Sequence, residues 1–236
     1  MSDNKTAKKN KNSINLDTTA FQIRESYKIA RTNLVYSVIK KGCKKLAFTS
    51  CSKGEGKTIT STNIAIALAQ QVNTKVLIVD CDLRRPQVHN ALGIEPSPGI
   101  TNYLNSECSK EDIVRKTHVK NLSAVTYGAL PPNPSELLAS RDMNEFIKDV
   151  EKEYDYIIFD TPPIGVVADA FPVIKQSDGV VLIVRHNQTT YPKFNKILDS
   201  IQRNGGKIIG VVVNSIDTVK VSKTGYGYGS AYGYYA

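Results

Sequence analysis

A glycine-rich stretch with a lysine and a threonine has the composition of a phosphate-binding loop, or P-loop. It reads SCSKGEGKT over residues 50–58 and directly follows a short apolar run at 46–49. Gly54 and Gly56 would let the backbone close around phosphate, so that its N–H groups and a helix N-terminus face the anion. Lys57 would neutralise the β- and γ-phosphates, and Thr58 would bind Mg²⁺. The residues predicted to hold the nucleotide are Ser52, Lys53, Gly54, Glu55, Gly56, Lys57, Thr58 and Ile59.

Cys51 stands where the general pattern G-x-x-x-x-G-K-[ST] has its first glycine, so the match needs independent support. Two acidic strand ends provide it. Asp80 and Asp82 follow the apolar run 76–79, and Asp160 follows the run 156–159. Carboxylates at such positions can hold Mg²⁺ or a reacting hydroxyl. Three such motifs in this order make separate turns and helix caps the weaker interpretation.

The acids divide by role in the mechanism that we expect. Asp80 would orient a substrate hydroxyl or accept its proton, while Asp82 and Asp160 would organise Mg²⁺ together with Thr58. The roles of Asp80 and Asp82 can be exchanged. Asn214, at the end of the last apolar run, is either an adenine-edge contact, because an amide both donates and accepts, or a simple turn residue.

Short apolar runs rich in β-branched residues alternate with helical stretches along most of the chain. The runs cover residues 46–49, 76–79, 122–127, 156–159, 180–184 and 208–213. They are nearly continuous in apolar character, as is typical of strands covered on both faces. We therefore predict an α/β fold of the P-loop NTPase type, with a mainly parallel central sheet flanked by helices. A helix from Thr18 or Thr19 to about Ile39 would precede the sheet, and residues 60–71 would follow the P-loop as another helix.

Composition indicates one core with a tail at each end. The 236 residues are 41% hydrophobic, enough for a single substantial domain. We expect a basic disordered leader at 1–17, a nucleotide-binding domain at 18–220 and a flexible Gly/Tyr-rich tail at 221–236. The apolar runs are strand-length, far from the roughly 20 residues of a spanning helix, so a cytosolic location is expected. The net charge of +9 selects no partner by itself.

The predicted tail at 221–236 is rich in tyrosine. Of the chain's twelve tyrosines, five lie between residues 226 and 235, interleaved with glycine. Without a nucleotide site, such a segment reads as a low-complexity stretch that binds by stacking. Beside a nucleotide site, exposed hydroxyls on a loose peptide are plausible phosphate acceptors. The predicted phosphorylation sites are Tyr226, Tyr228, Tyr232, Tyr234 and Tyr235.

The stretch Asp80-x-Asp82-Leu83-Arg84-x-Pro86 and the ending Asp160-Thr-Pro-Pro resemble motifs of the bacterial tyrosine kinases of capsule and exopolysaccharide synthesis. The resemblance covers nearly the whole chain. It implies an ATP- and Mg²⁺-dependent protein-tyrosine kinase in which Lys57, Asp80 and Asp82 are catalytic. It also implies that the kinase autophosphorylates its tail, in trans, to regulate polysaccharide synthesis or export.

The family also carries a Glu-x-x-Arg-x-x-Arg motif for ring assembly on its N-terminal helix. Glu25, Lys28 and Arg31 have that spacing, with lysine in place of the middle arginine. The same spacing also suits a solvated helix face. The resemblance implies a homo-oligomer, with an octameric ring as the family form. It further implies a transmembrane activator or polysaccharide co-polymerase, a protein-tyrosine phosphatase, and a cytoplasmic place at the inner face of the membrane through that partner. No nucleic-acid partner is expected.

The main alternative is a partitioning-type P-loop ATPase, a nucleotide-switched dimer that binds DNA or membrane. Members of that group carry a signature lysine five residues before the P-loop lysine, where this chain has Ser52. The tyrosine tail also argues against it. A nucleotide-gated scaffold without enzymatic activity is a third and weaker interpretation.

Overall fold

The fold is seen in a computed structural model that describes residues 16–216, except for the side chains of residues 16–20. The strands are β1 (Lys44–Ser50), β2 (Val76–Asp80), β3 (Arg115–Lys116), β4 (Leu122–Val125), β5 (Tyr156–Asp160), β6 (Gly179–Arg185) and β7 (Ile208–Asn214). The helices are α1 (Leu16–Ser37), α2 (Lys57–Ala69), α3 (Val88–Leu92), α4 (Ile100–Leu104), α5 (Lys110–Ile113), α6 (Pro134–Leu138), α7 (Arg141–Val150), α8 (Phe171–Lys175) and α9 (Tyr191–Arg203), with a 3₁₀ turn η1 (Ala168–Ala170).

The strands form one seven-stranded sheet in the order β3-β4-β2-β5-β1-β6-β7. All neighbours are parallel except β3, which runs antiparallel to β4 at one edge. The prediction of a mainly parallel α/β sheet is confirmed, and each of the six predicted runs contains a strand. The run 122–127 ends early as a strand because the carbonyl of Thr126 accepts the N–H of Ile100, at the start of α4.

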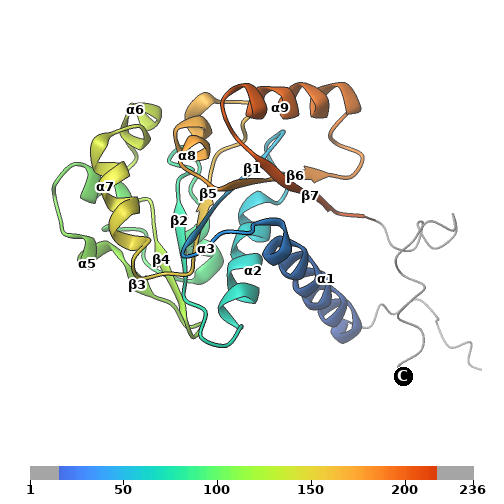
Figure 1. Ribbon diagram of the computed structural model, residues 1–236, viewed down its shortest axis with the longest axis horizontal. Coiled ribbons are helices and arrows are strands. Elements are labelled where there is room, and N and C mark those ends of the chain that lie inside the picture. The colour runs from blue at the N-terminus through green and yellow to red at the C-terminus, as the bar shows by residue number, and fades with distance from the viewer. Residues whose placement is uncertain (1–15, 217–236) are drawn as a thin grey trace, which may run out of the picture.

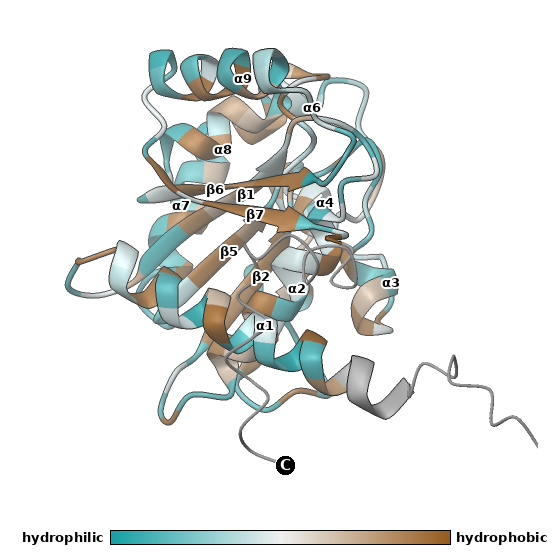
Figure 2. Ribbon diagram, turned by 90° about the vertical axis from the view of Figure 1, so that its right-hand side faces the viewer, coloured by the Kyte–Doolittle hydropathy of each residue, from teal (hydrophilic) through white to brown (hydrophobic). Residues whose placement is uncertain are grey.

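Helices cover both faces of the sheet (Figure 1). Along β2, Val76 and Ile78 join one core with α1, α2 and α3, while Leu77 and Val79 join another with α7. This division follows from the two-residue period of a strand. The strands are accordingly brown at the centre of Figure 2, and α9 turns its apolar side chains inward. Apolar strands sandwiched in this way leave their carboxyl ends as the polar edge of the sheet.

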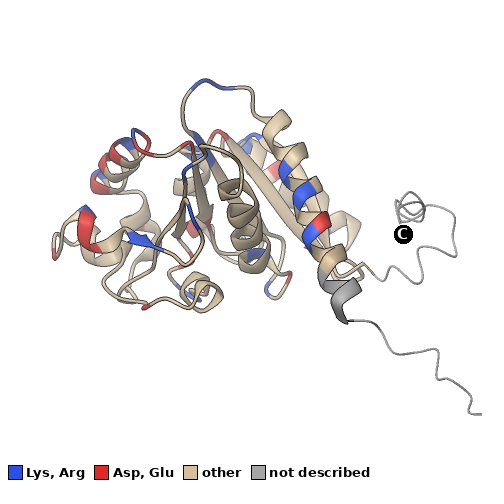
Figure 3. Cartoon of the chain, turned by 90° about the horizontal axis from the view of Figure 1, so that it is seen from below, with Lys and Arg blue, Asp and Glu red and all other residues tan. Residues whose placement is uncertain are grey.

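Helix α1 confirms the predicted N-terminal helix. Leu34 of the helix and Val38 directly after it pack into the core, and the Arg31 guanidinium donates to the Ala67 carbonyl of α2 at 3.1 Å. Charged residues follow one another along its length in Figure 3. Within residues 16–216, no helix combines the length and the apolar character needed to cross a membrane.

Candidate active site

The P-loop leaves the carboxyl end of β1 and enters α2 at Lys57, as the sequence predicts. Gly56 caps the helix with φ of 85°, a left-handed conformation that side chains other than glycine rarely adopt. A Cβ atom at this position would also lie 2.6 Å from the Asn214 amide nitrogen. Glycine is therefore required here by both backbone conformation and space.

Lys57 is buried at the centre of the site among oxygen atoms. Its Nζ lies 3.0 Å from Asp160 Oδ2, 3.4 Å from Asp82 Oδ2 and 3.3 Å from Thr58 Oγ1. Burial acts to lower the pKa of Lys57, but Asp160 and Asp82 outweigh burial, and the pKa is raised above its ordinary value. The lysine is thus held as a cation where phosphate would bind.

Asp160 accepts hydrogen bonds from the polar side chains at the start of α2. Its carboxylate accepts from the Thr58 hydroxyl at 2.6 Å and from the Ser61 hydroxyl at 3.1 Å, besides Lys57. β2 and β5 are paired in register, with Asp80 opposite Asp160, so both strands end in acid at the same level. The structure therefore brings Lys57, Thr58, Asp82 and Asp160 together, as expected from the three motifs.

Asp80 lies behind this cluster. It is fully buried, and its carboxylate accepts backbone N–H groups of Asp82, Gln87 and Val88 at 3.0–3.2 Å. Burial, and then the nearby Asp160, raise the pKa of Asp80 to about 8, against the effect of the Val88 N–H. Asp80 does not line the cavity, whereas Asp82 does. Asp80 therefore holds the turn after β2, and Asp82 is the acid that faces the cavity.

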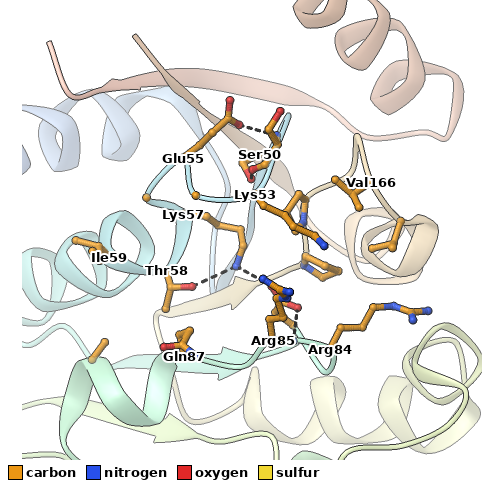
Figure 4. Close-up of a pocket in the computed structure, with 18 of the residues that line it drawn as sticks. Ser50, Lys53, Glu55, Lys57, Thr58, Ile59, Arg84, Arg85, Gln87 and Val166 are labelled. Atoms are coloured by element: carbon orange, nitrogen blue, oxygen red, sulfur yellow. Dashed lines mark hydrogen bonds and ion pairs between the residues drawn. The ribbon is translucent and has the colours of Figure 1, made fainter. Parts of the chain in front are cut away.

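A cavity of about 640 Å³ opens in front of the P-loop (Figure 4). All eight predicted loop residues, Ser52 to Ile59, line it together with Asp82. Its other walls are Arg84, Arg85, Gln87, Asn90 and Ala91 after β2, and Pro162, Pro163, Val166 and Val167 after β5. The volume lies within the range of small-molecule sites, roughly 300–1,000 Å³.

Asn214 contacts the P-loop and α2. Its amide donates to the Glu55 carbonyl at 2.8 Å and to the Thr60 hydroxyl at 2.9 Å, and it does not line the cavity. Because the amide N–H groups are engaged with the P-loop and with α2, the structure makes Asn214 a support for the loop.

Residues after β6 support the loop from the same side, and we had not predicted them. Gln188 donates to the Lys53 carbonyl at 3.0 Å, Lys193 donates to the Ser52 hydroxyl at 2.5 Å, and Thr189 donates to the Glu55 carboxylate. No motif marks these residues. The signal that indicates them is topological, because β6 pairs directly with β1 and ends beside the P-loop.

The predicted assembly motif on α1 is split by the structure. Glu25 and Lys28 form an exposed ion pair of 2.7 Å with each other, whereas Arg31 contacts α2 of its own chain. The five predicted phosphorylation sites of the tail, and residues 1–15 of the predicted basic leader, lie outside the described residues, whereas Leu16 and Asp17 belong to α1.

Fold and site together define a P-loop nucleotide-binding protein. A profile of the AAA domain family matches residues 43–207, most of the chain. The tyrosine-protein kinase YwqD of Bacillus subtilis is 38% identical over 86% of this chain and 85% of its own, and the putative tyrosine-protein kinase CapB of Staphylococcus aureus is 33% identical over 88% and 90%. The crystal structure of the chimerical protein CapA2B2 superposes with a TM-score of 0.77 at 31% identity, covering 81% of this chain and 84% of the other.

These similarities extend over both the P-loop and the acidic strand ends. The chain belongs to the family of bacterial tyrosine-protein kinases, and it is an ATP-using protein-tyrosine kinase. The resemblance drawn from the sequence motifs is confirmed, and the partitioning-type ATPase is set aside.

Proposed function

We propose that this kinase binds Mg²⁺-ATP in the cavity before the P-loop and phosphorylates tyrosines of its own C-terminal segment. The observation that carries the proposal is the convergence of Lys57, Thr58 and Asp82 on one cavity, with Asp160 buried behind them and bonded to Lys57 and Thr58. Phosphoryl transfer asks mainly for positioning and charge stabilisation. The buried Lys57 and the N-terminus of α2 would supply both the positioning and the charge stabilisation at the P-loop.

The donor set suits Mg²⁺. Thr58 offers a hydroxyl oxygen and Asp160 a carboxylate 2.6 Å from it, while the Asp82 carboxylate lies 3.4 Å from Lys57 Nζ. Mg²⁺ prefers oxygen ligands and is usually held by one or two carboxylates together with substrate phosphates. When bound, the ion would neutralise charge on the phosphates. Thr58 and Asp160 are the residues that we propose to hold it, with Asp82 at its side.

Asp82 is the acid that we propose for the acceptor hydroxyl. The tyrosine oxygen attacks the γ-phosphorus, the bond to the β-phosphate oxygen breaks, ADP leaves, and the phenolic proton passes to the carboxylate. Burial raises the pKa of Asp82 while Lys57 opposes the rise, which favours a role as proton acceptor. We therefore propose Asp82 as the proton acceptor in place of Asp80, which the sequence had favoured, because both carboxylate oxygens of Asp80 accept backbone N–H groups.

The acceptor segment is proposed to be the tail at 221–236, following a kinase domain at 18–220 and a basic leader at 1–17. About fifteen extended residues reach roughly 50 Å, enough to enter the site of a neighbouring copy. The five tyrosines would then be modified in trans. Each phosphate adds about −1.5 to −2 charge, so full modification would nearly cancel the net charge of +9.

We propose the remaining partners from the family resemblance. Copies of the chain would form a homo-oligomer, with the exposed face of α1 and its Glu25–Lys28 pair at the contact. A transmembrane activator would place the kinase at the inner membrane face. A protein-tyrosine phosphatase would reverse the modification. The match to the chimerical protein CapA2B2 supports the choice of activator. Capsule or exopolysaccharide synthesis would be the regulated process.

A mixing experiment tests self-phosphorylation in trans. Lys57→Met protein, which keeps its tail, is incubated with ATP, Mg²⁺, the cytosolic segment of the membrane activator and a second variant whose five tail tyrosines are phenylalanine. We expect mass spectrometry to find phosphate on the tail of the Lys57→Met protein only in the mixture. Phosphate confined to tyrosines of residues 18–220 would contradict the proposed acceptor.

A further inference from the structure

An ion pair joins the segment after β2 to the segment after β5. Residues of these two segments form what we call the outer walls of the cavity. Arg84 comes from the turn after β2 and Asp169 from η1, in the segment after β5. The guanidinium contacts both carboxylate oxygens, through Nε to Oδ2 and through Nη2 to Oδ1 at 3.3 Å. Two-point contact of this kind fixes the relative orientation of the groups.

The two partners differ sharply in exposure. The Arg84 side chain is 50% exposed, whereas the Asp169 side chain is only 5% exposed. A buried carboxylate is costly unless it is paired. Arg84 is the only residue of the described chain whose side chain bonds to that carboxylate. The pair therefore anchors the exposed turn after β2 to a buried point behind the opposite wall.

Each anchored loop carries residues that line the cavity. Arg85 and Gln87 lie one and three positions after Arg84, and Val166 and Val167 precede Asp169 by three and two positions. In Figure 4 the Arg84 side chain extends away from Lys57. Arg85, in contrast, has no side-chain hydrogen bond or ion pair within residues 16–216. The pair thus sets the spacing of the two walls, and it leaves the neighbouring cation available to a ligand.

The P-loop is held by other residues. Asn214, Gln188 and Lys193 contact it from β7 and from the segment after β6, and within residues 16–216 none of them is hydrogen-bonded to Arg84 or Asp169. Breaking the ion pair therefore leaves the phosphate-binding loop supported. Binding of nucleotide and alignment of the outer walls can be separated by measurement.

We infer that Arg84 and Asp169 are positioning residues that hold the two outer walls of the cavity at the spacing needed for phosphoryl transfer to tyrosine. The inference rests on the proposed function. Neither residue is assigned a contact with the reacting atoms. Their role is exerted through Arg85, Gln87, Val166 and Val167, which line the cavity.

The test compares full-length Arg84→Gln, Asp169→Asn and the double variant with the wild type. Arg141→Gln is the matched control, because Arg141 forms a 2.7 Å ion pair with Glu145 on the exposed surface of α7. Tail phosphorylation is measured at saturating Mg²⁺-ATP with the activator segment, and the nucleotide Kd is measured with a fluorescent ATP analogue. Since a 1 Å misplacement costs up to about 100-fold, we expect the rate to fall about tenfold to about 100-fold in both single variants. The Kd should change by less than about threefold, as for independently supported sites.

The double variant should be no slower than either single variant, because both remove the same contact. Arg84→Lys, which keeps the charge without the two-point geometry, should recover only part of the rate. Additive losses in the double variant, or a rate for Arg84→Gln equal to that of Arg141→Gln, would overturn the inference. If Asp169→Asn does not fold, Arg84→Gln decides alone because its side chain is half exposed. A wild type that never phosphorylates its tail would instead refute the proposed function, and this inference with it.

Discussion

Replacing Asn214 by alanine separates support of the P-loop from recognition of adenine. The amide donates to the Glu55 carbonyl at 2.8 Å and to the Thr60 hydroxyl at 2.9 Å. A typical hydrogen bond contributes about 0.5–1.5 kcal/mol net, so losing both removes about 1–3 kcal/mol from the conformation that binds phosphate. If the whole loss appears in binding, affinity falls about 5-fold to 150-fold.

The assay is a comparison of three ligands: ATP, GTP and inorganic tripolyphosphate, each titrated with Mg²⁺ by calorimetry. A supporting role predicts that all three weaken by the same factor, because the P-loop is expected to bind the phosphates that the three ligands share. Asn204→Ala serves as the control, since the side-chain amide of Asn204, directly after α9, donates to the Ser200 carbonyl and to no other group of residues 16–216. The reasoning is refuted if the ratio of ATP to GTP affinity collapses while tripolyphosphate binding is unchanged.

Two further predictions concern stability. Because burial and Asp160 raise the pKa of Asp80 to about 8, above about 3.9 for the unfolded chain, the folded state retains the proton longer. Stability should therefore fall as pH rises from about 4 to about 8, by at most about 1.4 kcal/mol per pH unit. Asp80→Asn should flatten this dependence in urea unfolding between about pH 5 and about pH 8, and an unchanged slope would count against the buried acid. Ile158→Ala should lower the free energy of unfolding by about 2–5 kcal/mol, because the side chain is fully buried beneath α2. A loss below about 1 kcal/mol in urea unfolding would contradict that packing.

The architecture could be predicted from sequence because both faces of the strands are buried. Apolar runs such as the one beginning at Val76 have no polar face, which favours a parallel sheet covered on both sides. The P-loop, Asp82 and Asp160 could be placed together for the same reason, since parallel strands end at one edge. The two-residue strand β3, Arg115–Lys116, could not be predicted because it is too short and too charged to show a period.

Side-chain partners were harder to predict than element positions. Asp80 and Asp82 are two residues apart and chemically alike, yet only the fold shows that Asp80 turns to the backbone N–H groups of Gln87 and Val88. Arg31 has the spacing of a subunit contact but lies against Ala67 of its own chain. Gln188 and Lys193 reach the P-loop over a sequence separation that no local pattern encodes.

Phosphotyrosine in the wild type and in Lys57→Met protein, both made without any other kinase, tests the central claim most directly. Lys57 is the buried cation between Asp82 and Asp160 at the N-terminus of α2. Methionine should therefore remove the positive charge that neutralises phosphate while nearly keeping the side-chain volume. After incubation with Mg²⁺-ATP and the activator segment, the account predicts tail phosphotyrosine in the wild type and none in the variant. Phosphotyrosine that persists in Lys57→Met protein would contradict the assignment of this site as the kinase centre.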